Sequence, residues 1–324
     1  MIGSILGGAA AVLGWIGRQG TRAVAALVVI GIAVPWLGAV LKPFVAESIF
    51  VILCISFLRV DAEALRGYLR RPGLVIAATA WTALAVPLMV GTVCLAVGLD
   101  RKSPDLYLAL MLQAIASPMM AAPAIAALMG LDATLVLASL VASTALIPFT
   151  AALFAELFIG PALTVSSMAI GLKLAAMLAG SVIVGFTLRR IAGVAAIERQ
   201  AERINGFNVL VLFVFVAALM ESVAGRFLAA PLLALGMTAL AFFMFFLVLG
   251  LTTLLFAFAG PNRALALGFM ASQRNTGLMV AAVSSALPEL AWLYFGLAQF
   301  PIYLSPQLLG PLVRRIAPAG TGRA

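Results

Sequence analysis

Residues Gly268–Leu287 read GFMASQRNTGLMVAAVSSAL, and this stretch decides how the rest of the chain is interpreted. It is apolar over roughly twenty residues, the length that crosses a bilayer, except for a group in its middle. That group is Gln273, Arg274, Asn275, Thr276 and Gly277. A charge at mid-membrane costs about 2.5–3.5 kcal/mol on insertion scales, so such residues face a protein interior or a water-filled cavity and mark function. They are our first candidates for a substrate site.

Composition places the chain among integral membrane proteins. It has 324 residues, of which 65% are hydrophobic and 10% charged, and its mean hydropathy of +1.20 excludes a soluble globular protein. The net charge of +9 reflects the Lys and Arg that collect in cytoplasmic loops of membrane proteins, so we expect no nucleic-acid partner. The chain has no histidine, which excludes histidine-based catalysis, and we expect no enzyme.

Apolar runs and their interruptions predict an all-α polytopic membrane protein with ten transmembrane helices. The predicted spans are 23–41, 45–60, 73–98, 105–130, 133–157, 164–188, 206–223, 228–258, 263–286 and 289–312. When Arg59 and Arg263, which stand at span ends, are counted with the adjacent cytoplasmic segments, fourteen of the 20 basic residues fall on one side, four on the other and two within spans. This bias predicts a multi-pass protein of the cell (inner) membrane with both termini in the cytoplasm. Residues 1–22 precede the first span and predict an N-terminal interfacial helix.

The ten spans divide into two sets of five. The first repeat covers residues 23–157 and the second covers residues 164–312, followed by a cytoplasmic tail of residues 313–324. Because each set has an odd number of spans, the second set enters the membrane in the opposite orientation. Inverted repeats of this kind are typical of secondary transporters.

Spans four and nine carry interruptions at corresponding places. Span four contains ASPMMAAP at 116–123 and span nine contains ASQRNTG at 271–277, and their Ala-Ser pairs lie 155 residues apart. A broken helix exposes backbone groups at mid-membrane, which is tolerated only where they meet protein, a cavity or a ligand. A pair of broken helices therefore indicates the substrate site, and Ser117, Pro118 and Pro123 join the candidates.

Four motifs resemble those of one transporter family. They are LRVDAEALRGYLRRPG at Leu58–Gly73, ASTALIP at Ala142–Pro148, RNTGL at Arg274–Leu278 and QFPIY at Gln299–Tyr303. With the ten-span layout, they resemble the bile acid:sodium symporter family, whose more distant relatives are the arsenite and auxin efflux carriers. The resemblance implies a panel domain of spans 1, 2, 6 and 7 and a core domain of spans 3–5 and 8–10. It also implies that broken helices 4 and 9 cross near the bilayer centre, with substrate bound between core and panel.

The chain departs from that family where sodium-using members hold the ion. By the resemblance, the family's span-nine glutamine falls on Arg274 and its acidic residue on Met270, while its Ser-Asn pair in span four falls on Ala122 and Pro123. Its span-three glutamine falls on Thr82, which joins the substrate-site candidates. Hard cations favour oxygen ligands, so these departures argue against sodium coupling. We expect no cofactor, and the coupling ion stays open between a proton, sodium and none.

Arg274 permits two interpretations. In the functional one, its guanidinium occupies the place of the family's cation, holds the carbonyl ends of the broken helices together and helps to bind an anion with the exposed N–H groups of the opposing half-helices. In the structural one, it pairs with a membrane-embedded acid such as Glu47 or Glu221, since internal pairing is common. A structural pair does not explain why polar residues gather around Arg274, so the functional interpretation is favoured.

The pattern favours a secondary active transporter of a small organic solute, anionic or amphipathic, that works by alternating access. Its expected partners are this solute and the lipid bilayer, and the sequence does not name the substrate or the oligomeric state. Two alternatives stay open. One is a non-transporting membrane sensor or scaffold that kept the fold. The other is a ten-helix transporter of the drug/metabolite type, which would not require paired broken helices.

Overall fold

The computed structural model describes residues 2–19, 26, 30–31, 33–59, 72–160, 166–283 and 286–316. These residues are almost entirely helical and contain no β-strand. Six of their helical segments are long and apolar enough to cross a membrane, judged by length and composition: Pro35–Leu58, Pro72–Ala96, Ala133–Ile159, Ser167–Ala192, Ala201–Ala229 and Pro231–Leu255. The chain is thus an all-α protein with several apolar helices of membrane-spanning length, as predicted.

The described helices are named in chain order. The first half contains α1 (Ile2–Gln19), α3 (Pro35–Leu41), α4 (Val45–Leu58), α6 (Pro72–Ala80), α7 (Val86–Ala96), α8 (Leu99–Lys102), α9 (Pro104–Ile115), α10 (Ala122–Met129) and α11 (Ala133–Phe154). The second half contains α12 (Ser167–Ala192), α13 (Val194–Arg199), α14 (Ala201–Ala229), α15 (Pro231–Leu255), α16 (Pro261–Ser272), α17 (Thr276–Val283) and α18 (Glu289–Ile316).

Several helix bounds differ from the sequence prediction. Spans one and two were expected to separate between residues 41 and 45, but a 3-10 turn at Lys42–Phe44 joins α3 to α4, because backbone hydrogen bonds continue through it from Gly38 to Val45. α14 begins before the predicted span 206–223, because its charged first turn is as compatible with a helix as its apolar part. The predicted span 23–41 is described only from residue 33 onward, apart from residues 26 and 30–31.

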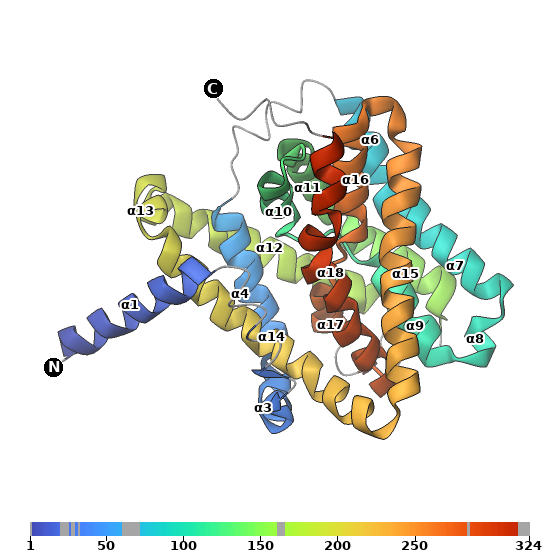
Figure 1. Ribbon diagram of the computed structural model, residues 1–324, viewed down its shortest axis with the longest axis horizontal. Helices are drawn as coiled ribbons and strands as arrows, with labels where there is room; N and C mark the ends of the chain where they lie inside the picture. The colour runs from blue at the N-terminus through green and yellow to red at the C-terminus, as the bar shows by residue number, and fades with distance from the viewer. Residues whose placement is uncertain are drawn as a thin grey trace.

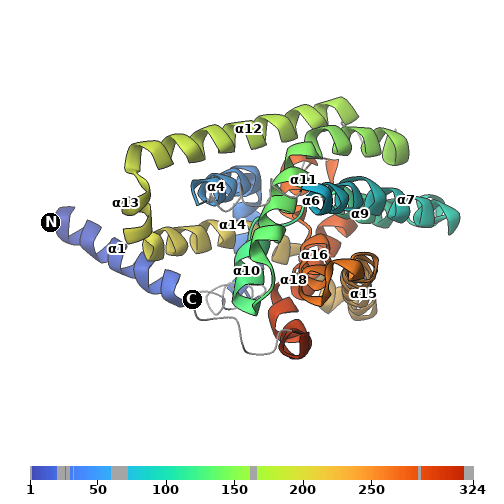
Figure 2. The same ribbon diagram turned by 90° about the horizontal axis from the view of Figure 1, so that it is seen from above.

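The helices form two neighbouring groups. Figure 2 shows α4 lying between α12 and α14, with α13 connecting these two helices at one end. α1 packs against the first turns of α14 and projects away from the rest of the molecule (Figure 1). On the other side, α6, α7, α9, α15, α16 and α18 lie together (Figures 1 and 2). α18 contacts both α14 and α15 and so connects the groups.

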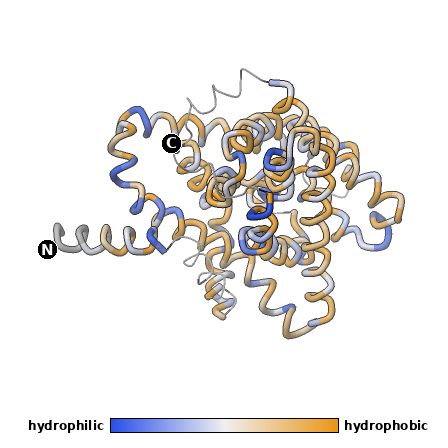
Figure 3. Tube along the Cα trace, turned by 45° about the horizontal axis from the view of Figure 1, so that its top comes forward, coloured by the Kyte–Doolittle hydropathy of each residue, from blue (hydrophilic) through white to orange (hydrophobic). Residues whose placement is uncertain are grey.

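The outer surface of the helices is apolar. Hydrophobic colour dominates the long helices in Figure 3, and hydrophilic colour is concentrated at several of the connections. Among the exposed side chains, Phe149 is 74% accessible, Leu232 84%, Leu254 74% and Phe258 78%. An apolar surface of this extent is not stable in water. It fits a protein whose helices face lipid.

A π-turn between α6 and α7 frees one carbonyl group inside the molecule. Within this turn, Trp81–Ala85, the Val86 N–H bonds to the Trp81 carbonyl, five residues back. The next residue is Pro87, which has no N–H, so the same pattern supplies no amide to the Thr82 carbonyl. Thr82 is buried, and a buried carbonyl needs another donor. A side chain from elsewhere in the fold must therefore donate a hydrogen bond to the Thr82 carbonyl.

Spans four and nine are interrupted, as the sequence predicts. The residues of predicted span four form α9 and α10 with an extended segment between them, and those of predicted span nine form α16 and α17. The two interruptions are hydrogen-bonded to each other. The Met119 N–H donates to the Gln273 carbonyl over 2.6 Å, and the Asn275 N–H donates to the Ser117 carbonyl over 2.8 Å. Backbone groups that the broken helices leave unpaired therefore satisfy one another inside the protein.

α12 approaches α4 closely at Gly185. A Cβ atom at this position would lie 2.9 Å from the Cys54 carbonyl oxygen and 2.9 Å from the Cβ of Phe57. At Gly236 on α15, by contrast, an added Cβ would meet no neighbouring atom of the described chain within 4 Å. Gly185 is therefore needed for packing, whereas Gly236 is not.

Replacing Gly185 by Leu is expected to lower the free energy of unfolding by about 1–3 kcal/mol, because the added side chain forces α12 away from α4. Thermal unfolding of the purified protein in detergent measures the effect. Gly236→Leu is the matched control and should not lower the unfolding temperature, since Gly is the poorer helix former by about 1 kcal/mol. An unchanged unfolding temperature in Gly185→Leu would show that α4 and α12 do not pack in this way.

Candidate functional site

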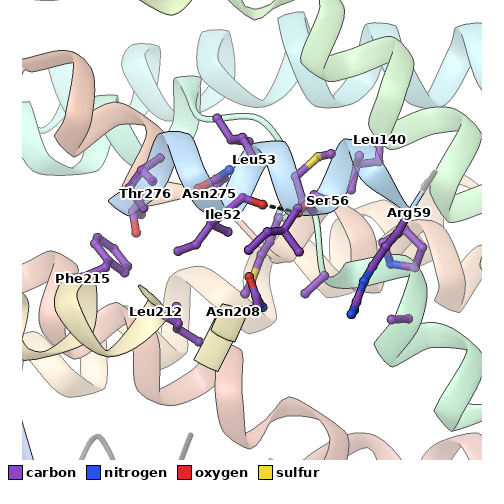
Figure 4. Close-up of a pocket in the computed structure, with 18 of the residues that line it drawn as sticks. Ile52, Leu53, Ser56, Arg59, Leu140, Asn208, Leu212, Phe215, Asn275 and Thr276 are labelled. Carbon is purple, nitrogen blue, oxygen red and sulfur yellow. Dashed lines mark hydrogen bonds between the residues drawn. The ribbon is translucent and has the colours of Figure 1, made fainter. Parts of the chain in front are cut away.

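A cavity of about 490 Å³ lies between α4 and α14 on one side and the two helix interruptions on the other. α4 contributes Ile49, Ile52, Ser56 and Arg59, which are three or four residues apart and therefore share one face of the helix. Figure 4 shows α4 running along the cavity. Ile49 and Arg59 are ten residues apart, which corresponds to about 15 Å along a helix axis. The cavity is therefore elongated.

α14 forms a second long wall with the same spacing. It contributes Asn205, Asn208, Leu212 and Phe215. Asn205 lies at the Arg59 end of the cavity, whereas Phe215 lies beside Thr276 at the other end (Figure 4). Arg59 is exposed, while Phe215 and Thr276 are buried. The cavity thus reaches the surface at its Arg59 end and is closed at its Thr276 end.

The charged residues that line the described cavity are both arginines, Arg59 and Arg274. Its described walls contain no Asp or Glu, and the remaining residues are apolar or carry neutral amide, hydroxyl or thioether groups. In the described part of the chain, no three His, Cys, Asp or Glu side chains are grouped to hold a metal ion. The chemistry of the cavity is therefore that of a cationic site with apolar walls.

Arg274 satisfies two carbonyl groups that the helices leave without partners. Its backbone forms an antiparallel bridge with Pro118, and its side chain points into the protein. Nη1 donates to the Ala116 carbonyl over 2.9 Å and to the Thr82 carbonyl over 3.3 Å. Ala116 directly follows α9, and Thr82 carries the carbonyl that the π-turn frees. One guanidinium therefore connects a helix end of predicted span four to predicted span three, whereas the functional interpretation expected the carbonyl ends of the two broken helices.

The structural interpretation of Arg274 is wrong for the acids that the sequence suggested. Glu221 accepts a hydrogen bond from Lys42 over 3.0 Å instead, and Glu47 is exposed. No described Asp or Glu lies within ion-pair distance of Arg274, which is only 4% exposed. Its Nε and Nη2 have no hydrogen-bond partner among the described residues. A buried charge without a counter-charge is costly, so this site favours an anion.

Arg59 is held in place at the open end of the cavity. Its Nη1 donates to the Asn205 side-chain carbonyl over 2.6 Å, and its Nη2 donates to the Ala201 backbone carbonyl over 3.2 Å. Partial burial lowers the pKa of the Arg59 guanidinium, but an arginine starts from so high a pKa that it stays charged at neutral pH. A fixed cation therefore marks the cavity mouth.

Two half-helices begin at the cavity. Pro123 in the first turn of α10 lines it, as do Thr276 and Gly277 in the first turn of α17. The Asn275 side chain caps α17, because its Oδ1 accepts the Leu278 N–H over 3.2 Å. Helix N-termini carry partial positive charge and unpaired N–H groups. Because both N-termini line the cavity, their partial positive charge adds to the charge of Arg274.

The predicted substrate-site residues fall into two sets. Five of them line the cavity: Pro123, Arg274, Asn275, Thr276 and Gly277. The other four lie behind it. Gln273 is fully buried and donates its amide to Ser305 on α18, Ser117 and Pro118 pair with the interruption of span nine, and Thr82 contacts Arg274 through its carbonyl.

Sequence reasoning missed the polar residues at the open end of the cavity. Ser56, Arg59 and Asn205 line it, although Arg59 was counted only as a basic residue of a cytoplasmic segment. A signal was present, because Ser56 and Arg59 are three residues apart near the end of an apolar helix, as are Asn205 and Asn208 near the start of another. Such spacing places two polar side chains on one helix face.

Comparison with known proteins gives no family for this chain. No protein-family model matches it, and a search of curated proteins finds no significant match. The resemblance to bile acid:sodium symporters therefore rests on the motifs quoted above, and the function is argued from the chemistry of the cavity.

Asn275→Ala is expected to lower the free energy of unfolding by about 1 kcal/mol, because α17 loses the side-chain acceptor at its N-terminus. Asn275→Ser is the matched control, since serine caps helices about as well as asparagine, and it should retain most of the stability. Thermal unfolding in detergent compares the two variants with the wild type. Equal losses in both would show that Asn275 does not act as a cap.

Proposed function

We propose that this protein is a secondary transporter of small organic anions in the cell membrane and that it works by alternating access. The observation that carries the proposal is the buried Arg274, which has no acidic partner among the described residues and lines an elongated cavity. Intramembrane charges are rare and usually mark a substrate or ion pathway. An anionic solute is the counter-charge that this site lacks.

The electrostatics of the closed end support an anion over a cation. Arg274 carries a full positive charge there, and the N-termini of α10 and α17 add partial positive charge beside it. In a site with apolar walls, these charges act over a low dielectric and so interact strongly with an anion. A cationic solute would meet three repulsive groups and no described carboxylate.

The same guanidinium bears on ion coupling. The Ala116 and Thr82 carbonyls, which accept from Arg274, are oxygen atoms of the kind that a hard cation would use as ligands. With these acceptors already occupied by a fixed charge, transport in this proposal does not depend on sodium. The anion gradient itself, exchange or a proton supplies the driving force.

We further propose that the fold is the ten-span inverted repeat that the sequence suggests. In this proposal, residues 23–157 and 164–312 form the repeats, both termini are cytoplasmic and residues 1–22 lie at the membrane interface. The group containing α4, α12 and α14 would be the panel, and the group containing the broken helices would be the core. The paired interruptions of spans four and nine support this assignment over a drug/metabolite-type fold, which does not require them.

Alternating access requires contacts that can separate at the closed end. Lys42 lies 4.8 Å from the centre of the Trp292 ring, and Arg226 of α14 forms an ion pair with Glu289 of α18. Both contacts join the proposed panel to the proposed core at the end of α4 opposite Arg59. Exposed ion pairs contribute at most about 1 kcal/mol, so these contacts can break during a transport cycle.

Arg274→Gln should weaken anion binding and abolish transport, because it removes the buried charge while keeping a polar side chain. The measurement is the thermal shift of purified protein with benzoate, octanoate and cholate, each compared with its neutral amide. Radiolabelled uptake of any stabilising carboxylate into proteoliposomes follows, with and without sodium. We expect stabilisation by a carboxylate but not by its amide, and at least about a tenfold loss of affinity in the variant.

Arg274→Lys is the matched control, because it keeps the charge and should retain part of the binding. Unchanged uptake in Arg274→Gln at normal expression would refute the proposed function. Binding of a carboxylate without net flux would instead favour the sensor or scaffold. Uptake that requires sodium would overturn the proposal that Arg274 replaces the ion.

A further inference from the structure

Two arginines, Arg274 and Arg59, line the cavity from different elements of the fold. Arg274 lies at the helix interruption, three residues before Gly277, which is at the closed end: a Cβ added to Gly277 would be 2.6 Å from the Ile49 Cδ1. Arg59 belongs to the open end, ten residues along α4 from Ile49. Figure 4 shows Thr276 and Arg59 at the two ends of the drawn site. The two ends are therefore separated by about 15 Å along the α4 axis.

The wall between these ends is mainly apolar. Ile52, Leu53, Leu140 and Leu212 lie along it (Figure 4). The Ser56 hydroxyl, which also lies there, donates to the Ile52 carbonyl of its own helix over 2.8 Å. The middle of the cavity thus offers mainly contact to hydrocarbon, beside the amide group of Asn208. A solute that fits it has an apolar middle.

Arg59 is placed for recognition and not only for membrane orientation. A basic residue that merely marks the cytoplasmic side needs no fixed conformation, and long side chains of this kind extend toward the interface. Arg59 is instead bonded to two different positions on the neighbouring helix α14. These bonds use two of its five N–H donors, and the other three make no hydrogen bond to the described residues. A guanidinium fixed in this way loses less entropy when it binds an anion.

We infer that the cavity takes an elongated dianion, a solute with an anionic group at each end and an apolar middle. This inference rests on the proposed function and names its substrate class. One anionic group lies toward Arg274 and the two half-helix N-termini, and the other binds Arg59. A monoanion held at Arg274 would instead place its apolar tail against the Arg59 guanidinium and leave that cation without a counter-charge.

The test compares three probes that differ in length or in one charge. Dodecanedioate has the required length and two charges. Its monomethyl ester keeps the length but loses one charge. Succinate keeps both charges but is too short to reach from one end of the cavity to the other. Binding to the purified protein in detergent is measured by isothermal titration. We expect dodecanedioate to bind at least about tenfold more tightly than either comparison compound, because the loss of one charged contact weakens binding by about this factor.

Arg59→Gln should lower the affinity for dodecanedioate about tenfold and leave that for the monomethyl ester unchanged. Arg59→Lys keeps the charge and should retain part of the preference. An unchanged unfolding temperature confirms that each variant is folded. Arg274→Gln should weaken dodecanedioate and its ester alike.

Two results would overturn the inference while the proposed function stands. The first is a dianion that binds no better than its monomethyl ester, and the second is a preference for the dianion that survives in Arg59→Gln. If dodecanedioate does not bind at all, the elongated dianion is also wrong as the substrate class. The proposed function fails separately, when no carboxylate in the benzoate, octanoate and cholate series binds in an Arg274-dependent manner.

Discussion

One buried positive charge organises the centre of this protein. Where two membrane helices are interrupted, their ends leave backbone groups that lipid cannot satisfy. Part of this need is met by the hydrogen bonds between the two interruptions. The rest is met by Arg274, which donates to a carbonyl at the end of α9 and to the one that Pro87 and the π-turn leave free. Arg274 and the hydrogen bonds between the two interruptions therefore support this unusual backbone together.

The same charge gives the cavity its chemical character. Removing a guanidinium from water is costly unless a counter-charge or several acceptors replace the water. Here two carbonyls replace it in part, and two of its nitrogen atoms have no described partner. The N-termini of α10 and α17 point toward the same region, so the local potential is positive. The residue that bonds to the interrupted helices therefore also gives the cavity a positive charge.

The two walls of the cavity explain how such a site is reached. α4 and α14 each present one face of side chains at helical spacing, and both faces change from apolar at the closed end to polar at the open end. Arg59 joins the two helices at the mouth. At the opposite end, α14 contacts α18 through an ion pair. The cavity is therefore open at one end, while contacts between polar side chains keep the helices together at the other end.

The sequence by itself determined the class of protein and the position of the helix breaks. Long apolar runs require helices in a membrane, and prolines or clustered polar residues such as 273–277 interrupt them locally, so both features are encoded in neighbouring residues. Only the tertiary structure decided which side chains share the cavity. Arg59, Asn205 and Arg274 are far apart in the chain, and Thr82 meets Arg274 only because a π-turn and an interruption pack together. Contacts of this kind depend on how helices are placed against each other, which hydropathy and spacing along one helix do not specify.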